Sequence, residues 1–255
     1  MHAAEEQIEF DGGLRGEHIA ARVRVGTPPT SDENCVWEKV SWTDSMRSEY
    51  PFVNKVPPPE ESGYKAFVKS CTQPEQQNSL HWIHKSVFDT LGNRAENAID
   101  RLIPKPAINF APSPDRGVVN VGSWFWIDKS AWKKISVTAY VPTKIGMLSV
   151  TTSATPKTII FSPNDGGADR LCSGPGRVWY PSFSDKIKSS CMYTYRHGSQ
   201  QQPNGRYRAK VAIEWDISVR TAIGKSRIGF SGRVSSVRTS TTVPLRIREI
   251  QAVAR

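Results

Sequence analysis

The sequence contains few cysteines and no long run of apolar residues. Only four of the 255 residues are cysteine, and none of them forms a C-x-x-C pair, which argues against a zinc site or a thioredoxin-type motif. No stretch approaches the roughly 20 apolar residues of a membrane-spanning helix, and the mean hydropathy is -0.46. The first residues, 1–6, show no basic segment followed by an apolar one, so no signal peptide is visible. Either the protein is cytoplasmic or the sequence begins inside a longer precursor.

Motifs of nucleotide binding and of hydrolysis are missing too. There is no P-loop, no G-x-G-x-x-G and no G-x-S-x-G. His197 lies near Ser199, with Asp165 elsewhere in the chain, but no oxyanion loop accompanies them, so we interpret His197 as a loop histidine. His81 and His84 have helical spacing, yet no nearby cysteine or carboxylate completes a set of metal ligands. The sequence therefore predicts no enzymatic activity, no catalytic residue and no cofactor.

The four cysteines favour an oxidising compartment. An even count at wide spacing fits two disulfides, Cys35–Cys71 and Cys172–Cys191, although four cysteines allow three pairings. The second pair would close a loop of about 20 residues, worth roughly 3 kcal/mol in the chain-entropy model. The alternative is four free thiols in a cytoplasmic protein. We expect an extracellular or cell-surface location.

Charge is distributed unevenly along the chain. The formal net charge is +10, but residues 1–115 hold 12 Lys and Arg against 17 Asp and Glu, whereas residues 116–255 hold 22 against 7. This asymmetry predicts two units with different surfaces. The basic half should attract a polyanion, such as nucleic acid or an anionic wall polymer, or an acidic partner that includes the first half of the chain itself.

The first 105 residues predict an arm followed by a small α+β subdomain. Residues 1–33 combine glycine, proline and scattered charge, and we expect a flexible amino-terminal arm or one early strand. Residues 34–105 are rich in loops and contain two cysteines, as a small domain stapled by a disulfide does. A helix is predicted for about 87–103, where apolar residues recur at i, i+3, i+4 and i+7, with Ser86 as its cap and Pro104 at its end.

From residue 106 to residue 255 the apolar period is two, which predicts a mainly β domain of the sandwich type. Residues 210–219 alternate apolar and polar side chains, as a half-buried strand does, and Asn204-Gly205 before them suits a tight turn. Residues 231–242, rich in serine and threonine, are expected as a flexible or edge segment. Candidate strands are 118–121, 124–127, 135–141, 147–151, 157–161, 178–180, 192–195, 207–219, 226–230 and 242–250.

Tryptophans are the first candidate binding groups of this half. Trp124 and Trp126 should share one side of their strand, because side chains two residues apart do. Trp215 is expected in the core, as in immunoglobulin-like domains. Trp132 and Trp179 are candidates for an exposed aromatic strip on which sugar rings stack.

Charged residues are the second candidate group. Arg206, Arg208 and Lys210 alternate along one predicted strand and therefore share a face, which favours either a phosphate or teichoic-acid contact or a solvated face that discourages edge pairing. Asp165 and Asp169 are weak candidates for a Ca²⁺ site, because they supply only two carboxylates. A hydrogen-bonded turn is the simpler interpretation, and we predict no metal.

A known domain type shares several of these features. The turn Asn164-Asp165-Gly166 is followed by the aromatic pair Tyr193 and Tyr195, and then by Gly205-Arg206-Tyr207 before a long strand. In these features the segment resembles the PKD (polycystic kidney disease) domain, an immunoglobulin-like β-sandwich of extracellular proteins. It departs from that pattern by lacking the tryptophan of the usual Trp-x-Phe-Gly-Asp-Gly turn, and by a two-cysteine insertion before the aromatic pair.

A second resemblance covers most of the chain and rests on residues 121–126, 172–176, 191–195 and 249–253. With these segments the chain looks like a group of secreted or surface proteins from high-GC Gram-positive bacteria. The resemblance implies fold and location and names no activity. We expect a non-enzymatic extracellular module that mediates protein–protein or protein–glycan interaction, within a surface appendage or a secretion assembly. The alternative function is polyanion binding through the basic half.

Overall fold

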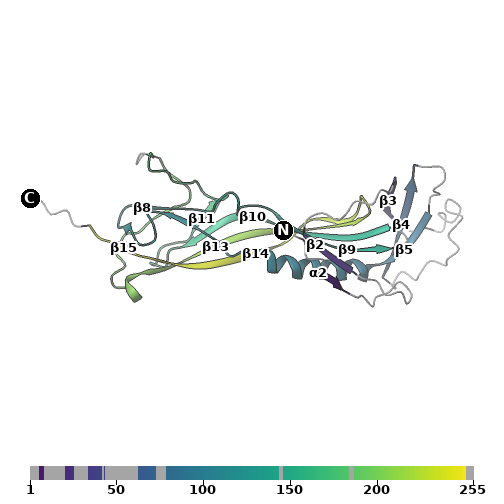
Figure 1. The fold of residues 1–255 in the computed structure, drawn as a ribbon, viewed down its shortest axis with the longest axis horizontal. Coiled ribbons are helices and arrows are strands. Elements are labelled where there is room, and N and C mark those ends of the chain that lie inside the picture. The colour runs from purple at the N-terminus through teal and green to yellow at the C-terminus, as the bar shows by residue number, and fades with distance from the viewer. Residues whose placement is uncertain are drawn as a thin grey trace, which may run out of the picture. The chain divides into compact units, whose positions relative to one another are not determined.

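The computed structural model is mainly β, with antiparallel sheets and, in the part that it describes, one α-helix (Figure 1). No helix among these residues is both long and apolar enough to cross a membrane. The predicted arm, 1–33, lies outside the described residues except for two short strands. The described residues are 6–8, 21–25, 34–41, 43, 63–72, 79–143, 146–183 and 187–250, with the side chains of 6–8, 21, 25 and 230–234 left out.

The strands form one large sheet and three smaller ones. The large, seven-stranded sheet has the order β1-β2-β9-β10-β13-β14, with β11 paired to β10, and the smaller sheets are β12-β8-β6, β3-β4-β5 and the parallel pair β15-β7. The element bounds are β1 Glu6–Ile8, β2 Ala21–Val25, β3 Cys35–Val40, β4 Tyr64–Cys71, β5 Ser79–His84, α2 Lys85–Leu102, β6 Asn109–Ala111, β7 Gly117–Val118, β8 Gly122–Trp126, β9 Ile135–Thr143, β10 Gly146–Ser162, β11 Arg170–Ser173, β12 Met192–Thr194, β13 Tyr207–Ile223, β14 Ser226–Leu245 and β15 Ile247–Arg248.

The chain divides into two compact units, and each is built from three segments. The chain leaves the first unit after Leu102, close to the boundary predicted near residue 105, but it returns there twice. The predicted domains 34–105 and 106–255 are consecutive in sequence, whereas unit 1 also includes two later segments of the chain. Unit 1 consists of residues 1–102, 135–154 and 217–234, and unit 2 consists of residues 103–134, 155–216 and 235–255.

In unit 1 the helix α2 packs on β9 and β2 of the large sheet. Its buried residues are Val87, Leu91, Ala95 and Ile99, four apolar side chains that repeat every fourth position and form one stripe. The helix begins two residues earlier than predicted. Its first turn is capped by His84, whose Nδ1 accepts a hydrogen bond from the Ser86 backbone N–H at 3.2 Å, so Ser86 is not the cap.

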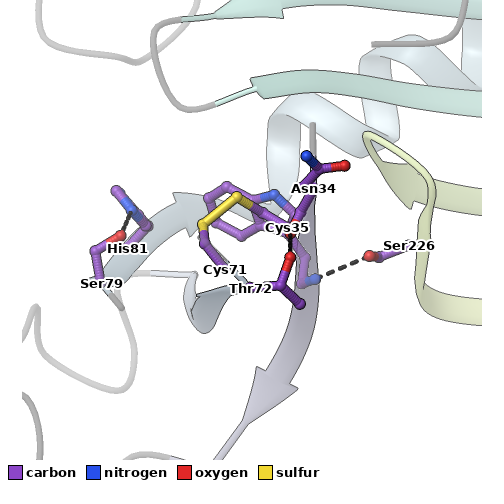
Figure 2. Close-up of a disulfide and its surroundings, with 8 residues drawn as sticks. Asn34, Cys35, Cys71, Thr72, Ser79, His81 and Ser226 are labelled. Atoms are coloured by element: carbon purple, nitrogen blue, oxygen red, sulfur yellow. Dashed lines mark hydrogen bonds between the residues drawn. A yellow bond between two sulfur atoms is a disulfide. The ribbon is translucent and has the colours of Figure 1, made fainter. Parts of the chain in front are cut away.

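The small sheet β3-β4-β5 carries the disulfide of unit 1 (Figure 2). Cys35 and Cys71 are directly opposite each other in the β3–β4 register, and their sulfurs are bonded, as predicted. Figure 2 shows how neighbouring groups surround the bond: Thr72 donates a hydrogen bond to the Asn34 carbonyl at 3.2 Å. This disulfide indicates an oxidising environment for the folded chain.

Unit 2 contains two sheets that pack on each other through aromatic rings. Phe125 of β8 stacks on Phe161 of β10 with ring centroids 4.6 Å apart, and Phe110 of β6 meets Phe161 at 6.2 Å. Trp215 of β13 is fully buried, as predicted, and donates from Nε1 to Thr239 Oγ1 at 3.1 Å. The core of unit 2 is therefore a sheet-on-sheet aromatic cluster.

The segment 231–242 belongs to β14, which ends the order of the large sheet and is its edge strand. Of the two alternatives that the sequence left open, a flexible segment or an edge segment, the described backbone forms the edge strand. Threonine is a β-favouring residue, and after Gly232 the segment contains no glycine or proline that would interrupt pairing.

Candidate functional site: an aromatic cavity in unit 2

A cavity of about 760 Å³ lies in unit 2 against the sheet β12-β8-β6. This volume is within the range of natural small-molecule sites, which are mostly apolar with a few polar groups. Aromatic rings dominate the lining, and a lysine, an asparagine and hydroxyl groups interrupt it. The residues that line the cavity are Phe110, Ala111, Pro112, Ser113, Asn120, Val121, Gly122, Trp124, Trp126, Trp179, Phe183, Ile187, Lys188, Met192 and Thr194.

Strand β8 supplies the floor of the cavity by alternation. Trp124 and Trp126 both line it, which confirms that they share one side of the strand, while Phe125 between them is 0% exposed and points into the aromatic core. Both faces of β8 are therefore covered. Gly122, at the start of the strand, leaves room for the Met192 side chain, since a Cβ there would lie 2.5 Å from the Met192 sulfur.

The described residues of the connection between β11 and β12, 174–183 and 187–191, form one wall of the cavity; we call them the wall loop. Its Phe183 meets Trp124 with ring centroids 5.9 Å apart, and the Arg177 guanidinium lies 4.8 Å from the Phe183 ring centroid. Gly176 has a φ of +82°, and a Cβ there would lie 2.7 Å from the Phe125 carbonyl oxygen. Only glycine permits this backbone to pass so close to β8.

Trp179 is the most exposed aromatic side chain of the cavity. Its exposed fraction is 36%, whereas Trp124 is buried and Trp126 is half-buried. Lys188, on the same wall loop, brings a positive charge to the cavity. A flat ligand with hydroxyl groups could stack one face on an indole ring and direct its polar groups toward the lysine.

The predicted acidic turn lies next to this region and is a hydrogen-bonded structure. Both carboxylate oxygens of Asp165 accept from the Tyr193 hydroxyl at 2.9 Å, and Oδ1 also accepts from the Gly167 N–H at 2.9 Å. Burial and then this carboxylate raise the pKa of Tyr193 to about 12. Asp169 is exposed. Among the described residues, no group of three His, Cys, Asp or Glu is placed to hold a metal ion.

The neighbouring tyrosines complete this support. Tyr195 is 0% exposed, donates from its hydroxyl to the Pro163 carbonyl at 3.2 Å, and stacks on Tyr207 with ring centroids 4.9 Å apart. Its pKa is raised, first by burial and then by the negative charge of Asp165. Tyr193 and Tyr195 thus hold the turn between β10 and β11 against β12, the strand that borders the cavity.

The other predicted binding residues lie outside the cavity lining. Trp132 is half-buried in the turn after β8. Arg208 and Lys210 are exposed on β13 and share a face with Arg206, as the alternation predicts. Arg206 pairs with Asp115 at 2.7 Å, so part of the basic stripe is neutralised locally.

The second cysteine pair is brought together without an S–S bond. Cys172 and Cys191 are buried free thiols, so the predicted bond between them is not formed in this structure. The Cys172 thiol donates at 3.6 Å to the carbonyl of Ser190, the residue directly before Cys191. Cys172 lies in β11, just before the wall loop, and Cys191 is the last residue of the loop.

The histidine candidates are not assembled into a site. His81 and His84 lie on strand β5, where a separation of three places them on opposite faces, and the His81 Nε2 is 2.7 Å from Ser79 Oγ. His197 is exposed. Ser199 is buried and its hydroxyl donates to the Gly205 carbonyl at 2.6 Å while it accepts from the Ile247 N–H at 3.0 Å. The Ser199 hydroxyl therefore joins the backbone at Gly205 to the backbone at Ile247.

Phe110, Phe183 and Met192 line the cavity and were not among the predicted binding residues. Residues 122–126, Gly-Ser-Trp-Phe-Trp, contained a usable signal, because three consecutive aromatic residues indicate a strand covered on both faces. The wall loop that covers the outer face has no periodic pattern, and its residues 178–180, predicted as a strand, form none.

Comparison with known proteins adds no relative. No known family model matches the chain, and no curated protein sequence and no solved structure is significantly similar to it.

Proposed function

We propose that this chain is a non-enzymatic extracellular binding module that takes a glycan into the aromatic cavity of unit 2. The cavity is the observation on which the proposal depends. Its aromatic side chains present flat apolar faces that suit the C–H faces of sugar rings, and the polar groups that interrupt them suit hydroxyl groups. The Cys35–Cys71 disulfide supports the oxidising location.

The proposal includes the finer classification of unit 2 as a PKD-like, immunoglobulin-like sandwich of a bacterial surface protein. Two antiparallel sheets packed through Phe125 and Phe161 support it, and so does the turn in which Tyr193 holds Asp165. A surface appendage or a secretion assembly is the setting we propose for such a module.

The test is a titration of the full chain with soluble oligosaccharides, followed by tryptophan fluorescence and calorimetry. The probes are hexamers of N-acetylglucosamine, glucose and mannose, and glycan strands released from peptidoglycan. We expect at least one to bind with a Kd of about 10 μM to 1 mM, the range of weak single-site recognition. Absence of binding by every probe would overturn the glycan assignment and leave a protein partner as the alternative.

A matched pair of tryptophan variants locates the site. Trp179→Ala should weaken binding by at least about tenfold, because it removes the most exposed ring of the cavity. Trp132→Ala removes a tryptophan of the same unit that does not line the cavity, and it should bind as the parent does. Equal effects of the two substitutions would contradict the assignment to this cavity.

Polyanion binding is the second candidate, and two exposed cations favour it. Arg208 and Lys210 project from the same face of β13, and no ion pair joins either to another described residue. If this face binds heparin or DNA, log affinity should fall linearly with log salt, and Arg208→Ala with Lys210→Ala should make the slope shallower by about two. Arg206→Ala is the control, since Asp115 already neutralises that side chain.

A further inference from the structure

Cys172 and Cys191 come from the two sheets of unit 2 that pack on each other through aromatic rings. Cys172 lies in β11, opposite Ile159 of β10, and so belongs to the large sheet. Cys191 directly precedes β12, and its carbonyl accepts a hydrogen bond from the Phe125 N–H of β8 at 3.1 Å. A covalent bond between these two side chains would join one sheet of unit 2 to the other.

The backbone brings the two thiols into the same buried region. Both are 0% exposed, and the Cys172 thiol donates at 3.6 Å to the carbonyl of Ser190, the residue directly before Cys191. The interaction with Cys191 and burial raise the pKa of Cys172, whereas the interaction with Cys172 lowers the pKa of Cys191. Cys191 is therefore the better nucleophile of the pair.

Hydrogen bonds tie the wall loop to the sheets near both of its ends, at its first residues and at Ser190 and Cys191. The Gly174 N–H donates to the Lys157 carbonyl at 3.1 Å, and the Pro175 carbonyl accepts from the Ile127 N–H at 2.8 Å. Farther along, the described part of the loop contacts the sheet through rings, as Phe183 contacts Trp124. Four cavity residues belong to this stretch: Trp179, Phe183, Ile187 and Lys188.

We propose that Cys172 and Cys191 form a reversible disulfide that sets the ligand affinity of the aromatic cavity by fixing both ends of the wall loop. This inference rests on the proposed function, because it concerns regulation of the same cavity. In the dithiol state the loop end at Cys191 is held by hydrogen bonds. In the disulfide state it is held covalently to β11, so less loop freedom is lost when a ligand binds.

The chemistry is thiol–disulfide exchange with a small-molecule disulfide such as oxidised glutathione. The Cys191 thiolate attacks one sulfur of that disulfide and releases one glutathione thiolate, which leaves a mixed disulfide on Cys191. The Cys172 thiolate then attacks the Cys191 sulfur and releases the second glutathione. Two electrons pass to the oxidant, and the two protons of the cysteine thiols end on the two glutathione thiols. Because both sulfurs are buried, exchange proceeds while the wall loop is open or during folding.

The experiment uses the full chain with Cys35→Ala and Cys71→Ala, in which only the second pair can change its redox state. It is compared in the dithiol state and after oxidation with oxidised glutathione, and alkylation followed by intact mass measurement counts the thiols. The matched control carries Cys172→Ala and Cys191→Ala, and keeps the Cys35–Cys71 bond. Two quantities are measured: the rate of trypsin cleavage after Arg177 and Lys188, and the Kd for the oligosaccharide that binds the parent chain.

The parent chain, reduced and oxidised, is measured in parallel in case the first variant does not fold.

We expect oxidation to slow cleavage within the wall loop several-fold and to tighten oligosaccharide binding about tenfold, with no redox response in the control. Equal Kd values in the two redox states would overturn the regulation while leaving glycan binding intact. Slower cleavage without oligosaccharide binding in either state would overturn the proposed function, and with it the control of glycan affinity. Two free thiols that persist under oxidised glutathione, in the variant and in the parent, would overturn the disulfide itself.

Discussion

The two units of this chain bury their cores in different ways. Unit 1 lays the aliphatic stripe of α2, with Leu91 at its centre, on strands of the large sheet. Unit 2 packs sheet on sheet through rings, with Phe161 in contact with Phe110, Phe125 and Tyr193. In unit 2 the aromatic side chains continue beyond the core, because Trp124 and Trp126 line the cavity on the other face of β8 from the buried Phe125. The aromatic cavity belongs to unit 2, and we place the binding site there.

Removal of the central ring of unit 2 should give the largest effect. Phe161→Ala deletes a fully buried ring in contact with other rings, and we expect a loss of about 3–5 kcal/mol in the free energy of unfolding. Urea denaturation followed by tryptophan fluorescence measures it. Trp179→Ala is the control and should stay within about 0.5 kcal/mol, because its ring is partly exposed. Equal losses of stability in the two variants would contradict the view that Phe161 belongs to the core and Trp179 belongs to the binding site.

Removal of the disulfide of unit 1 should come next. The Cys35–Cys71 bond spans a sequence separation of 36, so Cys35→Ala with Cys71→Ala should cost up to about 4 kcal/mol in the chain-entropy model. Oligosaccharide affinity should stay at the parent value, because the cavity belongs to unit 2. Thermal denaturation and calorimetric titration of the same preparation test both statements. A large loss of affinity in a folded variant would break the comparison between the units.

Removal of one hydroxyl group beside the cavity should give a smaller loss. Tyr193→Phe deletes the hydrogen bonds to Asp165, and we expect a cost of about 1.5–3 kcal/mol, the usual value for bonds to a charged group. Because the Tyr193 pKa is raised from 10.0 to about 12 on folding, its stabilising contribution is complete below pH 10 and is lost as the pH rises to about 12. Denaturation at pH 9 and pH 11 should therefore show a steeper decline in the parent than in Tyr193→Phe. If the free energy of unfolding declined equally in the parent and in Tyr193→Phe, the pH dependence could not be assigned to Tyr193.

Substitution of a helical glycine in unit 1 should give the smallest change in the free energy of unfolding. This change should be a gain in stability, whereas the preceding substitutions cause losses. Gly92 lies within α2 beside a smaller cavity of about 400 Å³, and a Cβ there would meet Val150 Cγ1 at 4.0 Å, an ordinary contact. Gly92→Ala should therefore stabilise the chain by about 0.5–1 kcal/mol through helix propensity. The midpoint of urea denaturation should rise. A lower midpoint would show that the helix needs the glycine for packing.

Periodic patterns predicted most elements, because each strand or helix imposes its own spacing on apolar residues. The helix and the strands around Trp124 and Tyr207 were found in this way. Residues 147–151 and 157–161, predicted as two strands, form the single strand β10, since the Ser, Thr and Pro between them do not interrupt pairing. The return of the chain to unit 1 could not be predicted, because the local period does not state which long strands pass from one unit into the other.

The candidate site was predicted in part. Trp179 was singled out by its residue type, and the shared face of Trp124 and Trp126 followed from strand geometry. Phe183 and Ile187 lie on a loop, where neither charge nor period indicates a position in space. The cavity itself exists only because the wall loop folds over β8, a tertiary contact that depends on Gly176.

Hydrogen–deuterium exchange of the full chain, with and without the oligosaccharide that binds it, tests the central claim most directly. We predict that bound ligand slows exchange in peptides that cover residues 120–126 and 177–194, and leaves peptides of β3, β4 and α2 unchanged. Protection confined to unit 1, or to residues 206–210 of β13, would contradict the account.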